Sequence, residues 1–322
     1  MAPSLILPSL RSETCGHPAR MVCMLTRRRL GRFVAGSIAA SALRPPLLLA
    51  AQGRGAPPIS VMMWTLKKMG TFEENLERVA EAGYRHVELV DEFKQWTPEQ
   101  TDRILARMKV LGIGIDAMAG MVRGFADREG VDAYIAELKG LIPIAERLGC
   151  GQIILLSGKR LAGVSADEQH RGSIETLMRA VPVLRESGIT GLIEPIDRME
   201  NPSIYLDGVT EAFAIARAVN SPGLKVLYDV YHEQRGYGNL IEKLNANIAQ
   251  VGLIHVADVP GRHEPGSGEI DYMRIYRKLG DLRYTGVIAM EFYPSGDVVE
   301  SLRVAREEAI RGFAGSADSL GG

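Results

Sequence analysis

Four polar side chains in the second half of the chain each end a short apolar run, and their types suit a metal ion. Three are carboxylates and one is an imidazole, and carboxylates held together repel one another or take up protons unless a cation neutralises them. Oxygen ligands with a single imidazole favour Mg²⁺ or Mn²⁺, with Zn²⁺ or Co²⁺ as alternatives. We therefore predict a divalent-metal site formed by Glu194, Asp229, His255 and Glu291.

The elements that must position these side chains alternate along the chain after residue 58. Short apolar runs predict strands at 59–64, 86–90, 114–117, 152–156, 191–194, 225–229, 252–256 and 287–292. Apolar residues three and four positions apart predict helices between them, including 72–82, 98–111, 131–148, 174–186, 209–219 and 240–249. Glycines follow several of these helices, as is typical of left-handed caps. Eight strand–helix units in about 250 residues predict an α/β fold, the (β/α)₈ barrel.

A barrel of this kind places its chemistry at the carboxyl ends of the strands. The four predicted ligands end consecutive strands and are therefore expected to meet above the barrel axis. A single acid at such a position is more often a helix cap or an ion-pair partner, so the metal prediction depends on all four together. Glu88 lies near the end of the strand predicted at 86–90, and we expect it to form a structural ion pair.

The two parts of the chain on either side of residue 52 carry opposite net charges. The formal net charge is −1, but residues 1–52 hold seven Arg, no Lys and one Glu, which leaves +6 there and −7 in the remainder. A mildly acidic body lacks the clustered Lys and Arg that phosphate contacts need, which excludes nucleic acid as the expected partner. With only three cysteines, the chain also cannot build a disulfide framework.

Residues 1–52 are expected to be a signal peptide and leader, and residues 53–322 the barrel. The run Thr26-Arg27-Arg28-Arg29-Leu30-Gly31-Arg32 matches the twin-arginine (Tat) pattern and precedes eleven uncharged residues, 33–43. Such a run is shorter than the about 20 residues that span a bilayer, so no stable membrane insertion is expected. We therefore expect a periplasmic or secreted protein that meets the Tat translocon during export. The alternative is a disordered basic tail or an uncleaved anchor.

Several segments of the second half form a recognisable set. They are Ile193-Glu194-Pro195-Ile196, residues 228–234, the run Pro260-Gly261-Arg262-His263-Glu264-Pro265 with the following Gly268-Glu269, and residues 291–294. With them, residues 59–313 resemble the hydroxypyruvate isomerase-like group of the xylose isomerase-type barrels. The resemblance implies that the four predicted ligands take the family's divalent-metal positions. Isomerases of this group commonly have Gln where His255 stands, whereas related ketose 3-epimerases have His.

The resemblance also implies a mechanism. Isomerisation and 3-epimerisation both begin with removal of a proton beside a carbonyl, and a divalent cation stabilises the resulting enediolate as a Lewis acid. One carboxylate takes the proton and a second group returns it to the adjacent carbon. Glu194 and Glu291 are the expected catalytic pair, with Asp229 and His255 mainly holding the ion.

Five further residues are candidates for substrate binding. His232 resembles a substrate-oxygen contact of both branches, and Glu200 has the spacing of a sugar-contacting Glu in the epimerases, although it could instead be a surface acid. Arg262 could hold a substrate carboxylate bidentately or merely pair with a nearby Glu, and His263 shares its loop. Trp64 could form a wall of the substrate site or pack in the core.

The expected function is a metal-dependent isomerase that converts hydroxypyruvate to tartronate semialdehyde. The first alternative is a ketose 3-epimerase or a related sugar or inositol isomerase, and the second is a non-catalytic secreted barrel that binds a polyol or sugar acid. A multi-zinc phosphoesterase is set aside because such sites need many histidines, and the body has five. The expected partner is a small-molecule substrate, and a homo-oligomer is left open.

Overall fold

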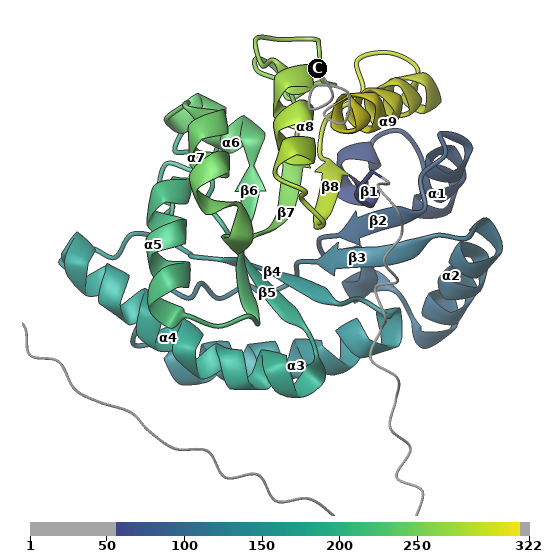
Figure 1. Cartoon of the computed structure of the whole chain (residues 1–322). Helices are drawn as coiled ribbons and strands as arrows, with labels where there is room; N and C mark the ends of the chain where they lie inside the picture. Colours follow the sequence, from purple (N-terminus) through teal and green to yellow (C-terminus); the bar gives the residue numbers. More distant parts are fainter. Residues whose placement is uncertain (1–55, 316–322) are drawn as a thin grey trace, which may run out of the picture. The chain divides into compact units, whose positions relative to one another are not determined.

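The computed structural model describes residues 56–315. Within them, eight parallel strands close into a barrel in sequence order, and helices surround it (Figure 1). Each strand pairs with the next along the chain, and β8 returns to pair with β1. The strands are β1 (Ile59–Met62), β2 (His86–Leu89), β3 (Gly114–Met118), β4 (Gln152–Leu156), β5 (Thr190–Glu194), β6 (Leu224–Asp229), β7 (Val251–Val256) and β8 (Val287–Met290). The predicted (β/α)₈ barrel is confirmed.

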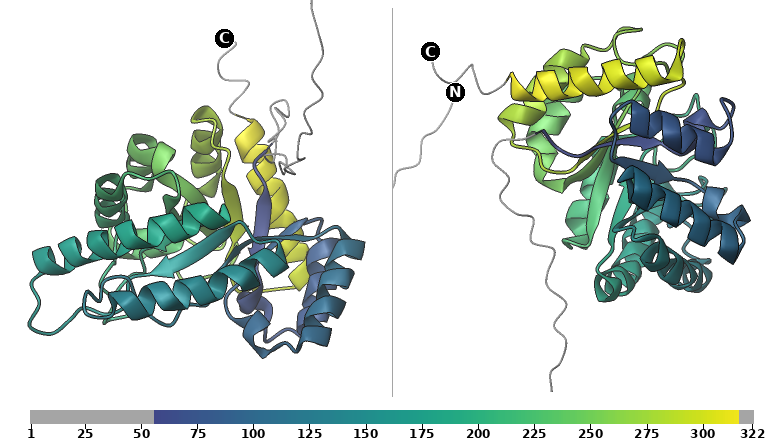
Figure 2. Two further views of the ribbon diagram at one scale, coloured as in Figure 1. Left: turned by 90° about the horizontal axis from the view of Figure 1, so that it is seen from below. Right: turned by 90° about the vertical axis from the view of Figure 1, so that its right-hand side faces the viewer.

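The helices form the outer layer. They are α1 (Phe72–Glu81), α2 (Pro98–Leu111), α3 (Val131–Leu148), α4 (Ala166–Ser187), α5 (Val209–Val219), α6 (Val230–Gly236), α7 (Leu240–Asn247), α8 (Tyr272–Asp281) and α9 (Val298–Ala314), with short 3₁₀ turns η1 (Met63–Leu66), η2 (Glu92–Gln95) and η3 (Ile248–Gln250). The last helix, α9, packs against both α8 and α1 and so completes the ring (Figure 2).

Local sequence explains where several helices begin and end. Thr71, Thr97 and Ser165 each form a capping box, in which the cap side chain and the side chain three residues later bond each other's backbone N–H groups. Three helices end at a glycine in the left-handed region, at Gly112, Gly149 and Gly188. The Ser165 capping box starts α4 at residue 166, two turns before the predicted start at 174.

Three predicted strands end earlier in the structure, and for the second, β2, the difference is one residue, from 90 to Leu89. The first ends at Met62 rather than Trp64, because the chain turns there into η1 and the Thr65 hydroxyl donates to the Met62 carbonyl at 2.8 Å. Trp64 therefore lies on a 3₁₀ turn above the barrel. The last strand ends at Met290, although the Glu291 N–H still donates to the Val256 carbonyl at 3.0 Å.

The barrel interior is filled by a separate apolar cluster, distinct from the larger core between strands and helices. Its buried members come from seven of the eight strands: Met62, Ala117, Ile154, Leu192, Leu227, Leu253, Val287 and Ala289. This layer closes the barrel below the strand ends, so that polar side chains at those ends have an apolar floor.

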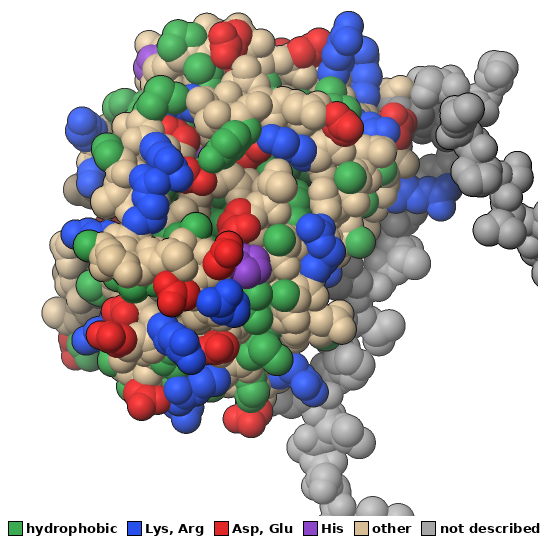
Figure 3. Space-filling view, turned by 90° about the vertical axis from the view of Figure 1, so that its left-hand side faces the viewer, with side chains coloured by type: hydrophobic (Ala, Val, Ile, Leu, Met, Phe, Trp, Pro, Cys, Tyr) green, Lys and Arg blue, Asp and Glu red, His purple; other side chains and the backbone are tan. Residues whose placement is uncertain are grey.

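The surface of the barrel carries both signs of charge. Figure 3 shows acidic and basic side chains interspersed on one face, without a large basic patch. Among residues 56–315, no helix is both long and apolar enough to cross a membrane. The predicted signal segment, residues 1–52, lies outside the described residues.

Candidate active site and metal centre

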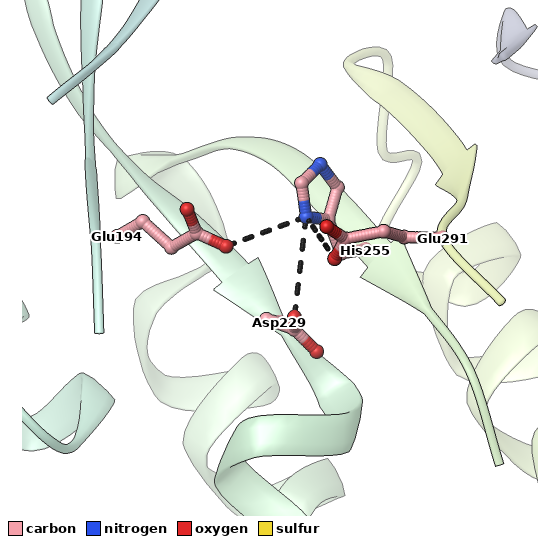
Figure 4. Close-up of side chains that lie close together, drawn as sticks. All are labelled: Glu194, Asp229, His255 and Glu291. Atoms are coloured by element: carbon pink, nitrogen blue, oxygen red, sulfur yellow. Dashed lines mark ion pairs between the residues drawn. The ribbon is translucent and has the colours of Figure 1, made fainter. Parts of the chain in front are cut away.

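The four predicted metal ligands meet at the carboxyl ends of β5 to β8 (Figure 4). Each offers one ligand atom, and these atoms all lie within 4.8 Å of one another. Glu194 and Asp229 are the last residues of β5 and β6, His255 lies one residue before the end of β7, and Glu291 directly follows β8. All four side chains are buried. The sequence-based expectation that they converge is confirmed.

The geometry of the cluster suits a divalent cation. His255 Nδ1 lies 3.0 Å from Glu291 Oε2, 3.4 Å from Glu194 Oε1 and 3.9 Å from Asp229 Oδ2. Among the described residues, neither His255 Nδ1 nor Asp229 Oδ2 has a hydrogen-bond partner, although both are buried. Buried polar atoms are rarely left without a partner. Three carboxylates and an imidazole nitrogen directed at one point could hold a metal ion.

The carboxylate of Asp229 divides its two oxygens between two tasks. Oδ1 accepts hydrogen bonds from the Tyr231 and His232 backbone N–H groups, at 2.7 and 3.2 Å, and so caps α6. Oδ2 is left facing the cluster. Helix α6 thus fixes the orientation of this ligand.

The imidazole of His255 is held from below by Glu88, whose Oε2 lies 2.8 Å from His255 Nε2. As expected, Glu88 is paired inside the protein, through the contact with His255. Its partner is a candidate metal ligand, which the sequence alone did not indicate.

His232 is buried beside the cluster, with Nε2 3.4 Å from Asp229 Oδ2. Its Nδ1 lies 2.7 Å from Asp197 Oδ2, which also accepts from Arg235 at 3.1 Å. Burial favours the neutral form of Asp197, but the hydrogen bonds from His232 and from the Glu200 backbone outweigh it and lower the pKa. Asp197 orients His232 and was missed by sequence reasoning; its place three residues after β5 is the signal that could have found it.

Arg262 crosses the top of the site between two aromatic rings. Its guanidinium carbon lies 5.3 Å from the centre of the Trp64 ring and 5.0 Å from that of Tyr231. Its Nη2 donates to Glu291 Oε2 at 2.6 Å, and Trp64 Nε1 donates to the other oxygen of the same carboxylate at 3.0 Å. The structure therefore brings Arg262 and Trp64 to the predicted metal ligands.

The loop that carries Arg262 is built around the buried carboxylate of Asp258. This carboxylate accepts from four backbone N–H groups of the loop between β7 and α8, those of Val259, Gly266, Gly268 and Ile270. A Cβ at Gly268 would lie 2.0 Å from the Val259 carbonyl oxygen, so only glycine fits there. The Tyr293 N–H donates to the Arg262 carbonyl at 2.7 Å and ties this loop to the one after β8.

The other two predicted substrate contacts lie farther out. Glu200 is about half exposed, with Oε1 3.6 Å from Arg262 Nη1 and Oε2 bonded to Arg235 at 3.2 Å. His263 Nδ1 lies 2.8 Å from the Tyr293 carbonyl oxygen, and within residues 56–315 no hydrogen bond or ion pair joins it to the four ligands. Their substrate roles stay predictions.

The two glutamates differ in their electrostatic surroundings. Burial raises the pKa of Glu194, and the nearby imidazole of His255 offsets this only in part. Burial also disfavours ionisation of Glu291, but the positive charge of Arg262, with the His255 ring beside it, outweighs burial and holds the pKa well below its usual range. Carboxyl groups whose pKa values are pushed apart can serve as acid and base in one reaction.

Known proteins share this barrel. A family model described as xylose isomerase-like TIM barrel matches residues 76–309. The hydroxypyruvate isomerase of Escherichia coli K12 is 31% identical over 239 residues, 72% of this chain and 92% of the relative. The 2-oxo-tetronate isomerase of Cupriavidus necator is 29% identical over 227 residues, 69% and 87% of the two chains.

Among solved structures, a protein of Brucella melitensis titled AP endonuclease, family 2, has a TM-score of 0.72, with 78% of this chain and 98% of that chain covered. At 24% identity, this likeness is one of fold. The family match spans most of the barrel, and the Escherichia coli isomerase aligns over nearly its whole length. The chain therefore belongs to the xylose isomerase-like TIM barrel family.

Proposed function

We propose that the protein is a divalent-metal-dependent isomerase that interconverts a small 2-oxo hydroxy acid with its aldehyde isomer, as in the conversion of hydroxypyruvate to tartronate semialdehyde. The observation that carries the proposal is the buried strand-end cluster in which Glu194 and Glu291 approach His255 Nδ1 from opposite sides (Figure 4). The relatives named as isomerases of hydroxypyruvate and of 2-oxo-tetronate support the same class of reaction.

The reaction needs two proton carriers. One glutamate removes the proton from the carbon that bears the hydroxyl, and the other delivers a proton to the former carbonyl carbon, while the hydroxyl proton passes to the former carbonyl oxygen. No electron acceptor is needed, because one carbon is oxidised as its neighbour is reduced. Mg²⁺ or Mn²⁺, or else Zn²⁺ or Co²⁺, held by the four ligands would supply Lewis-acid stabilisation of the charge that develops on the substrate oxygens.

Arg262 supports an acid as the substrate. Its guanidinium is buried between Trp64 and Tyr231 and next to Glu291, at the reacting end of the site. A guanidinium can bind a carboxylate through two parallel hydrogen bonds. His232, oriented by Asp197, faces the same space and would contact a substrate oxygen.

The runner-up function is a ketose 3-epimerase. Two observations favour it: His255 occupies the position where the resemblance expects Gln in the isomerases, and Glu200 approaches Arg262 at 3.6 Å. A non-catalytic polyol or sugar-acid binder is the third candidate, and the two glutamates at the cluster argue against it because a binder has no need of proton carriers.

One experiment separates the three candidates. Purified protein with Mn²⁺ is incubated in D₂O with hydroxypyruvate and, separately, with a panel of ketoses, and deuterium on carbon is followed by NMR. We expect deuterium in hydroxypyruvate and its isomer, loss of the exchange with a chelator, and its return with Mn²⁺. Exchange in a ketose alone would establish the epimerase, and exchange in no compound would leave a binding protein.

We also propose that residues 1–52 direct export through the Tat translocon. The observation that supports this is the twin-arginine pattern before an uncharged run. Lysine at both Arg27 and Arg28 is expected to retain the full-length precursor in the cytoplasm, as measured by cell fractionation. Export of this variant at the wild-type level would refute the Tat route.

A further inference from the structure

In the described part of the barrel, a buried carboxylate, that of Glu88, lies directly beneath the metal ligands. Glu88 on β2 is in register with Met62 of β1 and Ala117 of β3, and both of these side chains belong to the apolar interior cluster. Glu88 therefore also points inward, and its side chain is fully buried. An acid in apolar surroundings is unfavourable unless another group compensates for it, so its position calls for an explanation.

The contacts of Glu88 lead to a single side chain. Its Oε2 lies 2.8 Å from His255 Nε2, and its Oε1 has no hydrogen-bond partner among residues 56–315. Within the described part of the chain, the imidazole is thus the one hydrogen-bonding group that this carboxylate serves. The other nitrogen of the same ring, Nδ1, faces Glu194, Asp229 and Glu291.

A carboxylate at Nε2 decides what Nδ1 can do. Carboxylates accept hydrogen bonds and do not donate them when ionised, so Glu88 favours the ring form with its proton on Nε2. That form presents the lone pair of Nδ1 to the cluster. A carboxylate behind a ligating imidazole also makes the imidazole a stronger base and fixes its rotation.

We propose that Glu88 is the positioning residue of the metal centre: it keeps the His255 proton on Nε2, so that Nδ1 is the ligating atom, and it strengthens that ligand. The inference rests on the proposed function in one respect, that the cluster binds a divalent cation. Glu88 itself touches neither the substrate space nor the ion. It acts through the ring of His255.

A purely structural ion pair would behave differently. Removing Glu88 would then change the stability of the barrel and leave the affinity for metal unchanged. The chain offers a matched control on the same strand, where His86 Nδ1 lies 2.8 Å from Asp116 Oδ1 at the opposite end of β2. That second pair has the same chemistry, and no hydrogen bond or ion pair in the described residues joins it to the four ligands.

The test compares Glu88→Leu, Glu88→Gln and Asp116→Asn for Mn²⁺ affinity, by calorimetry and by the EPR signal of free Mn²⁺, with circular dichroism as the check on folding. We expect Glu88→Leu to weaken Mn²⁺ binding by about 10- to 100-fold. Glu88→Gln keeps a carbonyl oxygen that can accept from Nε2 and should lose less, and Asp116→Asn should bind like wild type. If the Leu variant does not fold, Glu88→Gln decides alone, with a measurable loss of affinity as the supporting result.

A second readout reports the ring directly. In ¹⁵N-histidine-labelled protein with Mg²⁺, the ¹H–¹⁵N spectrum should show His255 with a hydrogen-bonded proton on Nε2 and none on Nδ1. The same proton should exchange faster with water in the Leu variant.

The possible failures are distinguishable. Wild-type protein that binds no divalent cation would overturn the metal function and this inference together. Wild-type protein that binds Mn²⁺ while Glu88→Leu binds it equally well would overturn the inference alone. Equal losses in the Leu and Gln variants would also overturn it, because charge rather than the hydrogen bond would then carry the effect.

Discussion

The two halves of the barrel share one architecture but differ in what stands at their strand ends. β5 to β8 deliver Glu194, Asp229, His255 and Glu291 to one point. β1 to β4 end in the apolar side chains of Met62, Leu89, Met118 and Leu156. Trp64 and Glu88 are the first-half residues seen to contact the cluster, one from above and one from below. The second half provides the ligands, and Trp64 and Glu88 of the first half support two of them.

The loops of the two halves also differ in the burial of the carboxylates that hold them. In the first half, Glu92 and Glu137 accept from N–H groups after β2 and β3, and both side chains are only half-buried. In the second half, buried carboxylates organise the backbone after β5 and β7: Asp197 bonds the Met199 and Glu200 N–H groups, and Asp258 bonds four N–H groups of its loop. Such carboxylates fix loop geometry with charge-assisted hydrogen bonds. The comparison teaches that in this fold the chemistry requires both polar strand ends and loops that are ordered before a ligand arrives.

The strongest test of this division removes each proton carrier of the second half in turn and compares the result with the loss of a glutamate in the first half. Glu194→Gln and Glu291→Gln are each expected to lower kcat by about 10²- to 10⁴-fold, because the amide cannot transfer the proton. The matched first-half change is Glu92→Gln, at a half-buried glutamate after β2 that accepts a hydrogen bond from the Val90 N–H at 2.7 Å. It should leave kcat near the wild-type value. Steady-state kinetics on protein of native circular dichroism measures all three, and full activity in either second-half variant would refute the assignment.

The next test concerns Arg262, which lies above the four ligands. Arg262→Lys keeps the positive charge but loses the planar fork, and we expect kcat/KM for an acid substrate to fall by about 10- to 100-fold, as for loss of a hydrogen bond to a charged group. The fall should be smaller for neutral ketoses. Equal losses for acids and ketoses would show that Arg262 positions Glu291 and does not bind a substrate carboxylate.

Asp197→Asn is expected to have a smaller effect, a loss of folding stability that depends on pH. The pKa of Asp197 is lower in the folded protein than in the unfolded chain, so its stabilising contribution is present above the unfolded pKa and is lost as pH falls through the folded pKa. The stability advantage of wild type over Asp197→Asn, measured by urea unfolding, should therefore be present at pH 7, begin to fall near the unfolded pKa of about 4, and vanish only once the pH is below the folded pKa. An advantage that persists in acid would contradict this account.

The smallest effect is expected for Asp116→Asn, which removes the partner of His86 at the start of β2 and should change only the folding stability. The hydrogen bond to Asp116 raises the pKa of His86, so the stability that this pair contributes is present below the unfolded pKa of about 6.5 and is lost as pH rises through the folded pKa. Asp116→Asn should lose less than about 1 kcal/mol at pH 6, since the pair is partly exposed, and nothing at pH 9. Thermal unfolding at both pH values measures it. A marked loss of activity would break the contrast between the halves.

The sequence was sufficient for the fold and for the ligands, for a physical reason. Strand and helix periods are local, and the carboxyl ends of a parallel barrel meet at one face, so Glu194, Asp229, His255 and Glu291 could be predicted to converge. Asp197 and Asp258 could not be predicted, because their partners are backbone N–H groups whose directions exist only after folding. The link between Glu88 and His255 spans 167 residues and depends on which side chains of β2 and β7 point inward.

The Asp258 loop has a consequence for affinity. Flexible arginines lose rotational freedom when they grip a ligand, and each ordered long side chain can lower affinity by about 0.5–1.5 kcal/mol. Here that loss is incurred during folding, because Asp258 fixes the loop and two aromatic rings hold the guanidinium. A substrate that meets such a rigid arginine gains the full benefit of contact only if its carboxylate has the right distance from its carbonyl. The enzyme should then discriminate between acid substrates more by the length of their carbon chain than by their charge.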